Sequence, residues 1–246
     1  MEEKGKFHWA WLILAICFVD LFVNYSVRLG YGVVLPEMIR TLGFGRTAGG
    51  SIYNSYLLTY ITFSPFTGYL TDRVGARRVI TLCLLILGVA VFMMGTVDAL
   101  WSACIIYGVV GLGAAGLWGP VFTLGQRWCA FHRRGFALGI LATGYGLGFA
   151  AMGAVFPWVV TNFSWRSAWF ILGGLALAMV AVNGIFLRSD PIHCGVQPWG
   201  AVRDAIDRNN VDKAPAKRIP MSYLIKDSRF WLIGFSYFAI ACSLYG

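Results

Sequence analysis

The sequence predicts an all-α membrane protein with several membrane-spanning helices. Of its 246 residues, 58% are hydrophobic and only 13% are charged, whereas a soluble domain carries about a quarter charged residues. Several apolar stretches reach the roughly 20 residues that a helix needs to cross a bilayer. Helices are expected because the backbone polar groups of a segment in lipid must pair within that segment.

Six apolar stretches follow one another as candidate spans. The first begins at Trp9, with Trp11 as a second interfacial aromatic anchor. It is too long for a signal peptide and has no small-residue cleavage site, so we expect it to be retained. Charged or turn-forming residues separate the later stretches. The predicted spans cover residues 9–40, 46–69, 77–97, 100–128, 134–160 and 165–187.

The chain changes character after the sixth span. Residues 188–228 contain five aspartates among basic residues and four of the eight prolines, which indicates a linker. Within it, Val202 and Ile206 would share one side of a helix and Arg203 and Asp207 another, which favours a short amphipathic helix on the membrane surface. A mostly disordered loop is the alternative. Residues 229–246 are apolar again and predict the start of a seventh span. The predicted domains are therefore residues 1–187, 188–228 and 229–246.

The distribution of basic residues predicts the orientation of the chain. Sixteen of the twenty lysines and arginines lie in the N-terminus, the turns near residues 73 and 133, and residues 188–229. Loops rich in Lys and Arg are cytoplasmic. We therefore expect an integral protein of a plasma membrane or bacterial inner membrane, with the N-terminus and the 188–228 loop in the cytoplasm. The net charge of +9 then needs no nucleic-acid partner.

Nothing in the pattern of reactive residues predicts an enzyme or a metal site. The six cysteines form no CxxC pair and the three histidines are scattered, so neither a disulfide framework nor a metal-ligand cluster is expected. Paired carboxylates and a nucleophile–base pair are also missing from the sequence pattern. We expect no catalytic residue and no cofactor.

The turn between the second and third spans carries a family pattern. It reads Gly-Tyr-Leu-Thr-Asp-Arg-Val-Gly-Ala-Arg-Arg over residues 68–78. This resembles the G-x-L-x-D-R-x-G-R-K/R turn of major facilitator transporters, with Ala76 where a basic residue is usual. The resemblance implies a twelve-span fold of two six-helix bundles. This chain would be the N-terminal bundle, the linker and the start of helix 7, with a C-terminal six-helix half as its partner.

Further stretches are similar to one branch of that superfamily. The sixth span opens with Trp165-Arg166, and a P-x-x-x-G-x-x-P-x-G spacing runs from Pro191 to Gly200. These resemble the monocarboxylate and oxalate/formate antiporter branch, as do residues 127–148. The resemblance implies a secondary transporter that moves a small organic anion, such as lactate, pyruvate, oxalate or formate, by alternating access. A coupling proton or a counter-anion would drive transport.

Alternatives to this function remain open. A sugar or drug carrier of the same superfamily is one, although Tyr107 stands where many proton-coupled drug exporters carry an arginine. A membrane-embedded enzyme or a non-transporting membrane subunit is another.

The first span carries the most polar interior. Asp20, Asn24 and Arg28 are spaced four residues apart, and Tyr31 follows, so all four fall on one broad helical stripe. A charge at membrane depth costs at least ~2.5–3.5 kcal/mol on insertion scales, so these groups should face the bundle interior or a wet cavity. We expect Asn24, Arg28 and Tyr31 to bind an anionic substrate and Asp20 to couple a proton. Alternatively, Asp20 bonds a neighbouring helix and Arg28 extends to the outer interface.

Aromatic residues in spans 4 and 5 are further candidates. Trp118 and Tyr145 lie among glycines and are expected to line the substrate cavity, although aromatic residues at helical spacing are also common in packing. The resemblance implies that spans 1, 2, 4 and 5 face that cavity. Weaker candidates lie in span 2: Tyr53, Asn54, Tyr56 and Tyr60.

The resemblance also implies a conformational switch in the turn at residues 68–78. Asp72 is expected to follow the helix directly and to form charge contacts between the two halves that break as they rock. The alternative is a solvated turn that only sets topology. The expected switch residues are Gly68, Asp72, Arg73, Gly75 and Arg77.

Overall fold

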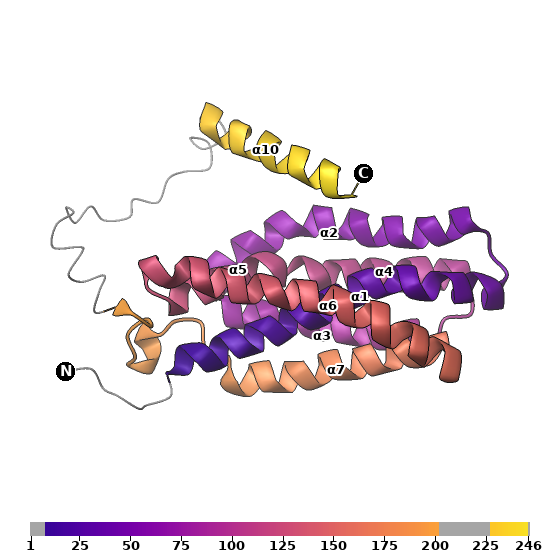
Figure 1. The fold of residues 1–246 in the computed structure, drawn as a ribbon, viewed down its shortest axis with the longest axis horizontal. Helices are drawn as coiled ribbons and strands as arrows, with labels where there is room; N and C mark the ends of the chain where they lie inside the picture. Colours follow the sequence, from indigo (N-terminus) through magenta and orange to yellow (C-terminus); the bar gives the residue numbers. More distant parts are fainter. Residues whose placement is uncertain (1–7, 202–226, 246) are drawn as a thin grey trace. The chain divides into compact units, whose positions relative to one another are not determined.

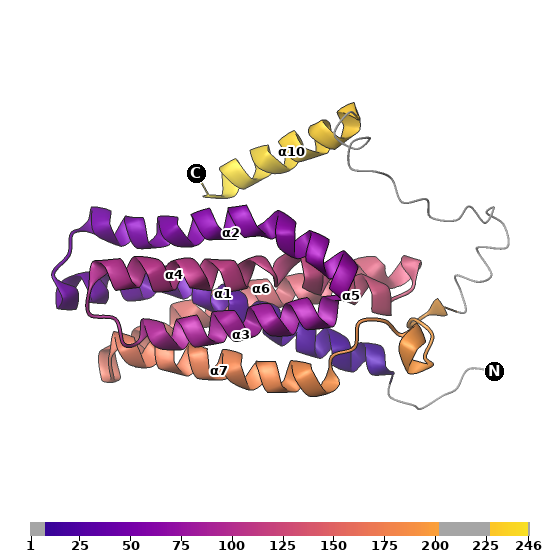
Figure 2. The ribbon, with the colours of Figure 1, turned by 180° about the vertical axis from the view of Figure 1, so that it is seen from behind.

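The computed structural model describes residues 8–201 and 227–245, which are helical for most of their length. They divide into two units, with the boundary between Ala205 and Ile206, and each unit is described by itself. In the first, long helices lie side by side and alternate in direction (Figures 1 and 2). Its helices are α1 (Trp9–Leu42), α2 (Arg46–Val74), α3 (Ala76–Met94), α4 (Leu100–Ala115), α5 (Trp118–Trp128), α6 (Arg134–Asn162) and α7 (Trp165–Phe186).

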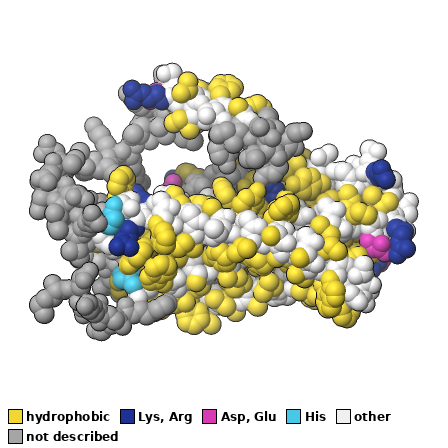
Figure 3. Space-filling model, viewed as in Figure 1, with side chains coloured by type: hydrophobic (Ala, Val, Ile, Leu, Met, Phe, Trp, Pro, Cys, Tyr) yellow, Lys and Arg dark blue, Asp and Glu magenta, His cyan; other side chains and the backbone are white. Residues whose placement is uncertain are grey.

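Five helical segments are long and apolar enough to cross a membrane within the described residues. They are Trp9–Leu42, Ala76–Met94, Leu100–Trp128, Phe131–Asn162 and Trp165–Phe186. The second predicted span, residues 46–69, also forms a helix, α2, but its many Ser, Thr, Tyr and Gly residues make it less apolar than the others. On the face drawn in Figure 3, hydrophobic side chains cover the length of the bundle and most visible charged ones lie toward its ends. This is the surface that a bilayer requires.

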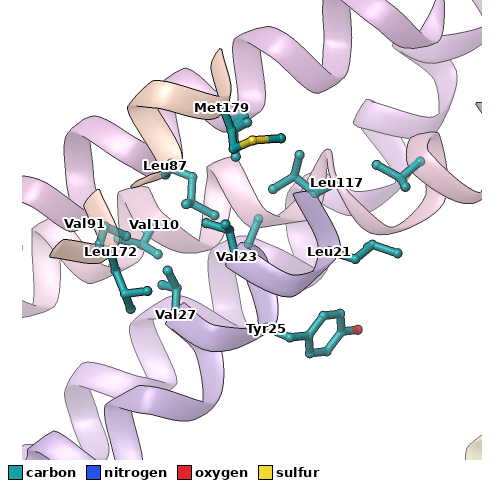
Figure 4. Packing of buried hydrophobic residues seen from close by; sticks show 14 of the residues in the cluster. Leu21, Val23, Tyr25, Val27, Leu87, Val91, Val110, Leu117, Leu172 and Met179 are labelled. Atoms are coloured by element: carbon teal, nitrogen blue, oxygen red, sulfur yellow. The ribbon is translucent and has the colours of Figure 1, made fainter. Parts of the chain in front are cut away.

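The core of the bundle is built from aliphatic side chains of several helices. Figure 4 shows Val23 and Val27 of α1 among residues of α3, α4 and α7 such as Leu87, Val110 and Leu172. The most extensive helix pairs are α1 with α6, α2 with α4, and α3 with α7. Each pair joins helices that are distant in the sequence, so the six predicted spans form one bundle.

Glycines allow α1 and α6 to pack backbone against backbone. A Cβ atom on Gly144 would lie 2.8 Å from the carbonyl oxygen of Phe18, and one on Gly148 would lie 2.7 Å from that of Phe22. The Ser26 hydroxyl donates to the Gly148 carbonyl at 3.5 Å. Small residues serve close helix approach in membranes in this way. Close packing also accounts for Gly113, which lies against the backbone of α3; the G-x-G-x-x-G run over residues 111–116 is part of this packing.

One predicted boundary is wrong, and one predicted span contains an interruption. The predicted turn after residue 69 is helical, because α2 continues through Asp72 and Arg73 to Val74, and only Gly75, with φ of +92°, separates it from α3. A positive φ favours glycine, which explains why the helix ends there. The predicted fourth span is present as one segment, Leu100–Trp128, but its helix is interrupted at residues 116–117, because Pro120 in the first turn of α5 lacks the N–H that would bond back across this point.

The segment after α7 folds back onto the end of the bundle where α1 begins. The Trp199 N–H donates to the Trp128 carbonyl at 2.9 Å, and the Ala130 N–H donates to the Trp199 carbonyl at 3.0 Å. The Trp199 ring lies 4.9 Å from Trp11 and 4.1 Å from the guanidinium of Arg133. The amphipathic helix predicted near residue 205 lies outside the described residues.

The described part of the second unit is the helix α10 (Ser228–Tyr245). It begins close to the predicted start of the seventh span. The Asp227 side chain accepts from the Arg229 N–H at 3.0 Å, which caps the first turn. Large apolar side chains such as Phe230 and Leu232 are exposed on it.

Candidate functional site

Arg28 lies in the middle part of α1 within a group of tyrosines. Its guanidinium carbon is 5.9 Å from the ring centre of Tyr25 and 5.6 Å from that of Tyr60. Tyr53 and Tyr56 of α2 also interact with it electrostatically. The side chain is half-buried. The predicted cation is therefore held by aromatic faces and phenol groups, which attract a cation without neutralising it.

The tyrosines form a continuous array across three helices. Tyr31 stacks on Tyr53 at 5.8 Å and on Tyr107 at 4.7 Å, and Tyr56 stacks on Tyr60 at 5.9 Å. The Tyr31 hydroxyl donates to the Gly49 carbonyl at 2.7 Å. Tyr31 is thus buried and committed to packing between α1 and α2, so its predicted contact with substrate would need that hydrogen bond to break.

A second aromatic group joins the predicted residues of spans 4 and 5 to Arg28. The ring of Tyr25 is 5.4 Å from Trp118 and 4.3 Å from Tyr145, and Trp118 is 4.4 Å from Phe122. Figure 4 shows Tyr25 pointing away from Val23 and Val27. Because Tyr25 contacts Arg28, Trp118 and Tyr145, it connects three of the predicted site residues. Tyr25 was not among the residues predicted from the sequence.

Asn24 lies beside Tyr25 in the chain and is buried. Its Oδ1 atom has no hydrogen-bond partner among the described residues. A buried acceptor without a partner carries a desolvation cost of about 1–3 kcal/mol. A hydrogen-bond donor on a bound molecule, such as a hydroxyl group, could satisfy this oxygen.

Asp20 belongs to a different place in the bundle. Its carboxyl is fully buried and accepts from the side-chain amide of Asn183 on α7, at 3.1 and 3.0 Å to the two oxygens. The predicted polar stripe therefore divides, because Asp20 contacts α7 whereas Arg28 contacts tyrosines of α1 and α2. Asn183 was missed, although a lone amide in the apolar stretch 165–187 was a signal that could have found it.

The predicted switch residues lie together at the end of the bundle where α2 meets α3. Asp72 and Arg73 are exposed in the last turn of α2, and Gly68 is exposed one turn earlier. The Arg77 guanidinium donates to the Gly184 carbonyl, and the Arg77 N–H donates to the Ser189 hydroxyl at 3.2 Å. These bonds join the start of α3 to the end of α7. Asp72 has no ion-pair partner in the part of the chain that the structure describes.

Metal ligands do not gather anywhere in the described ranges 8–201 and 227–245, where no three His, Cys, Asp or Glu side chains could hold an ion together.

The fold and the site define a class of protein, a bundle of membrane helices that holds a cation, amides and aromatic rings between its helices. Comparison with known families shows to which family of membrane proteins the chain belongs. A model of the Major Facilitator Superfamily matches residues 12–246, and the chain belongs to that superfamily.

The chain is also similar to individual transporters, and it shares its fold with a solved transporter structure. The chain is 24% identical to a probable sulfoacetate transporter of Cupriavidus necator, over 95% of the chain and 54% of the relative. It is 27% identical to a 4-hydroxybenzoate transporter of Acinetobacter baylyi, over 72% of the chain and 38% of that protein. Among solved structures it resembles an inward-facing, unoccupied bacterial homologue of the human lysosomal transporter Spinster. The TM-score is 0.67 at 18% identity, over 76% of this chain and 45% of the other. The chain thus spans about half the length, or less, of these proteins.

Proposed function

We propose that the protein is a secondary transporter of small organic anions and that Arg28 binds the anionic group of the substrate. The observation that carries the proposal is the position of Arg28, a half-buried cation in the middle part of a membrane helix, against the rings of Tyr25 and Tyr60 and near Tyr53 and Tyr56 of α2. A cation held at membrane depth among helices is the kind of group that binds an anionic substrate. Sulfoacetate and 4-hydroxybenzoate, after which two relatives are named, are organic anions.

Within this proposal the other site residues have distinct roles. Asn24 supplies a buried amide one helical turn before Arg28 on α1. Trp118 and Tyr145 form an aromatic wall together with Tyr25, whose ring contacts both of them. Tyr31 holds α1 against α2 at the same level. Monocarboxylates such as lactate and pyruvate, and oxalate or formate, remain the proposed cargo. Asp20 is the proposed proton site, with anion exchange as the other means of coupling.

The test is substrate uptake by the full chain in proteoliposomes, with labelled lactate, oxalate and 4-hydroxybenzoate offered separately. A hydrogen bond to a charged group contributes about 1.5–3 kcal/mol, so we expect Arg28→Gln to raise KM by roughly 10- to 100-fold. Arg28→Lys should restore part of the affinity, because lysine keeps the charge but loses the planar fork. Arg46→Gln is the matched control, because Arg46 is an exposed arginine at the first residue of α2. Unchanged KM and rate in Arg28→Gln would remove this residue from the site.

We further propose that the end of the bundle carrying residues 72–78 and 188–201 faces the cytoplasm. Thiol labelling can test this, because Cys194 is exposed at this end whereas Cys129 is buried and burial raises the pKa of its thiol. A membrane-impermeant maleimide added outside intact cells should leave Cys194 unlabelled and should label a cysteine introduced by Gly45→Cys. A Cys194→Ser variant supplies the background. Labelling of Cys194 from outside would reverse the assigned orientation.

A further inference from the structure

A pocket of about 990 Å³ opens at the end of the bundle, between the junction of α2 and α3 and the chain that follows α7. It is separate from the tyrosine-lined site around Arg28, which lies in the middle part of α1. Five arginines and two aspartates line it. These charged residues are Asp72, Arg73, Arg77, Arg78, Arg127, Arg188 and Asp190.

The positive charge of this pocket is only partly compensated by its own residues. Arg127 pairs with Asp190 at 3.4 Å, and the Arg77 guanidinium donates to the Gly184 carbonyl. Arg73 lies over the ring of Tyr69 at 4.7 Å. Arg78 is exposed and forms no hydrogen bond or ion pair with the described residues. The pocket therefore presents guanidinium groups to an anion, and guanidinium forks match the oxygens of a phosphate.

One wall of the pocket is apolar and belongs to a helix that crosses the membrane. Leu82 and Leu85 of α3 line it and are 52% and 41% exposed. Val74, at the end of α2, adds a third exposed apolar side chain. A soluble anion would use only the arginines. A phospholipid would use both parts, with its phosphate on the arginines and its first acyl carbons on the leucines.

We propose that this pocket binds the phosphate head group of an anionic glycerophospholipid. Basic pockets between membrane helices are suited to such head groups, and a bilayer supplies the ligand at the depth where α3 begins. The site lies against Ser189 and Asp190, so an occupied pocket would join the α2–α3 junction to the segment that follows α7. The proposal does not depend on what the protein transports.

The experiment measures lipid binding to the full chain, purified in mild detergent, by native mass spectrometry. Dioleoyl phosphatidylglycerol is the probe, dioleoyl phosphatidylcholine is the zwitterionic lipid, and inorganic phosphate is the soluble competitor. Each basic residue near a membrane surface contributes to anionic lipid binding, so we expect Arg78→Gln to weaken phosphatidylglycerol binding about fivefold. Arg78→Lys should retain most of it. Arg46→Gln, at the opposite end, should leave binding unchanged.

Phosphatidylglycerol binding that is tighter than phosphatidylcholine binding, about fivefold weaker in Arg78→Gln and unchanged in Arg46→Gln, would support the proposal. Arg78 is exposed and makes no described polar contact, so its replacement should leave the fold intact, and an unchanged melting temperature would check this. Equal binding of the two lipids, or equal binding by wild type and Arg78→Gln, would overturn the proposal. Displacement of the lipid by millimolar phosphate alone would assign the pocket to a soluble anion and would also overturn it.

Discussion

Asp20 and Asn183 place an acid and an amide together inside the apolar part of the bundle. A charge at this depth costs at least about 2.5–3.5 kcal/mol, and a hydrogen bond to a charged group returns about 1.5–3 kcal/mol. The amide of Asn183 spans both oxygens of the carboxyl at 3.1 and 3.0 Å. The hydrogen bonds from Asn183 therefore offset part of the cost of a charged carboxylate at this depth, and Asp20 stays the proposed proton site.

Replacement of Asp20 by asparagine tests that role with little change in shape. If Asp20 carries the coupling proton, Asp20→Asn should abolish accumulation driven by an imposed pH gradient and leave exchange of labelled for unlabelled substrate intact. Proteoliposomes with a preset pH difference measure both. Asp98→Asn is the control, since that carboxylate pairs with Arg166 at the surface. If Asp20→Asn still accumulates substrate when a pH gradient is imposed, Asp20 does not carry the coupling proton.

From the sequence it could be predicted that the polar residues of α1 face the interior of the bundle, but not which residues they contact there. Spacing placed Asp20, Asn24 and Arg28 on one stripe, and they are buried or half-buried as expected. Residues eight apart on a helix still differ in direction by about 80°, and this difference sends Asp20 to Asn183 and Arg28 to Tyr60. Which helix lies on either side depends on packing between distant segments, which periodicity within one helix does not report.

At the scale of helices, the starts were easier to predict than the ends. Helices α1, α2, α4, α6 and α7 begin at the predicted residues, where charged, aromatic or turn residues precede an apolar run. The predicted end of α2 was wrong because charged residues do not by themselves end a helix. A helix that leaves the membrane can continue in water until a glycine ends it, as Gly75 does here. The interruption between α4 and α5 was missed because the stretch stays apolar through Gly116 and Pro120.

The approach of α1 to α6 determines whether Tyr25 meets Tyr145. Gly144 faces the Phe18 carbonyl across this contact, whereas Gly146 has nothing within 4 Å. We therefore expect Gly144→Ala to destabilise the protein by about 1–3 kcal/mol, the usual cost of overpacking. Gly146→Ala adds the same methyl group to the same helix in open space, so it should keep stability or raise it by up to about 1 kcal/mol, because alanine is the better helix former. Thermal unfolding of the full chain in detergent measures both.

A large decrease in melting temperature for Gly144→Ala alone would confirm that this contact is set by the missing side chain. Equal behaviour of the two variants would mean that the helices can separate without cost, and the aromatic wall would then need another explanation. If Gly144→Ala still folds, weaker transport in this variant, in which Arg28 is retained, would show that the aromatic wall depends on the spacing of α1 and α6.

At the scale of the whole molecule, the chain covers about half the length, or less, of the relatives it matches. We propose that this bundle acts together with a second bundle of helices in a two-bundle transporter. The superfamily pattern around Asp72 is exposed at one end of the bundle, and the described residues give Asp72 no ionic partner. A charge with no partner in its own bundle is suited to contact a neighbouring one. Gly75 and Arg77 fix the α2–α3 junction that presents it.

Asp72→Asn tests whether that charge holds one state of the transport cycle. Loss of an ionic contact between bundles should shift the balance between inward-open and outward-open forms by about 1–3 kcal/mol, the usual size of such couplings. We expect net uptake to fall at least fivefold at unchanged expression and melting temperature, while substrate binding to the detergent-solubilised protein remains. Glu37→Gln, which removes a carboxylate from a surface pair with Arg40 at the far end, should transport normally. Wild-type cycling in Asp72→Asn would reduce residues 68–78 to a turn that sets topology, because a switch whose charge can be deleted without effect on the cycle does not control it.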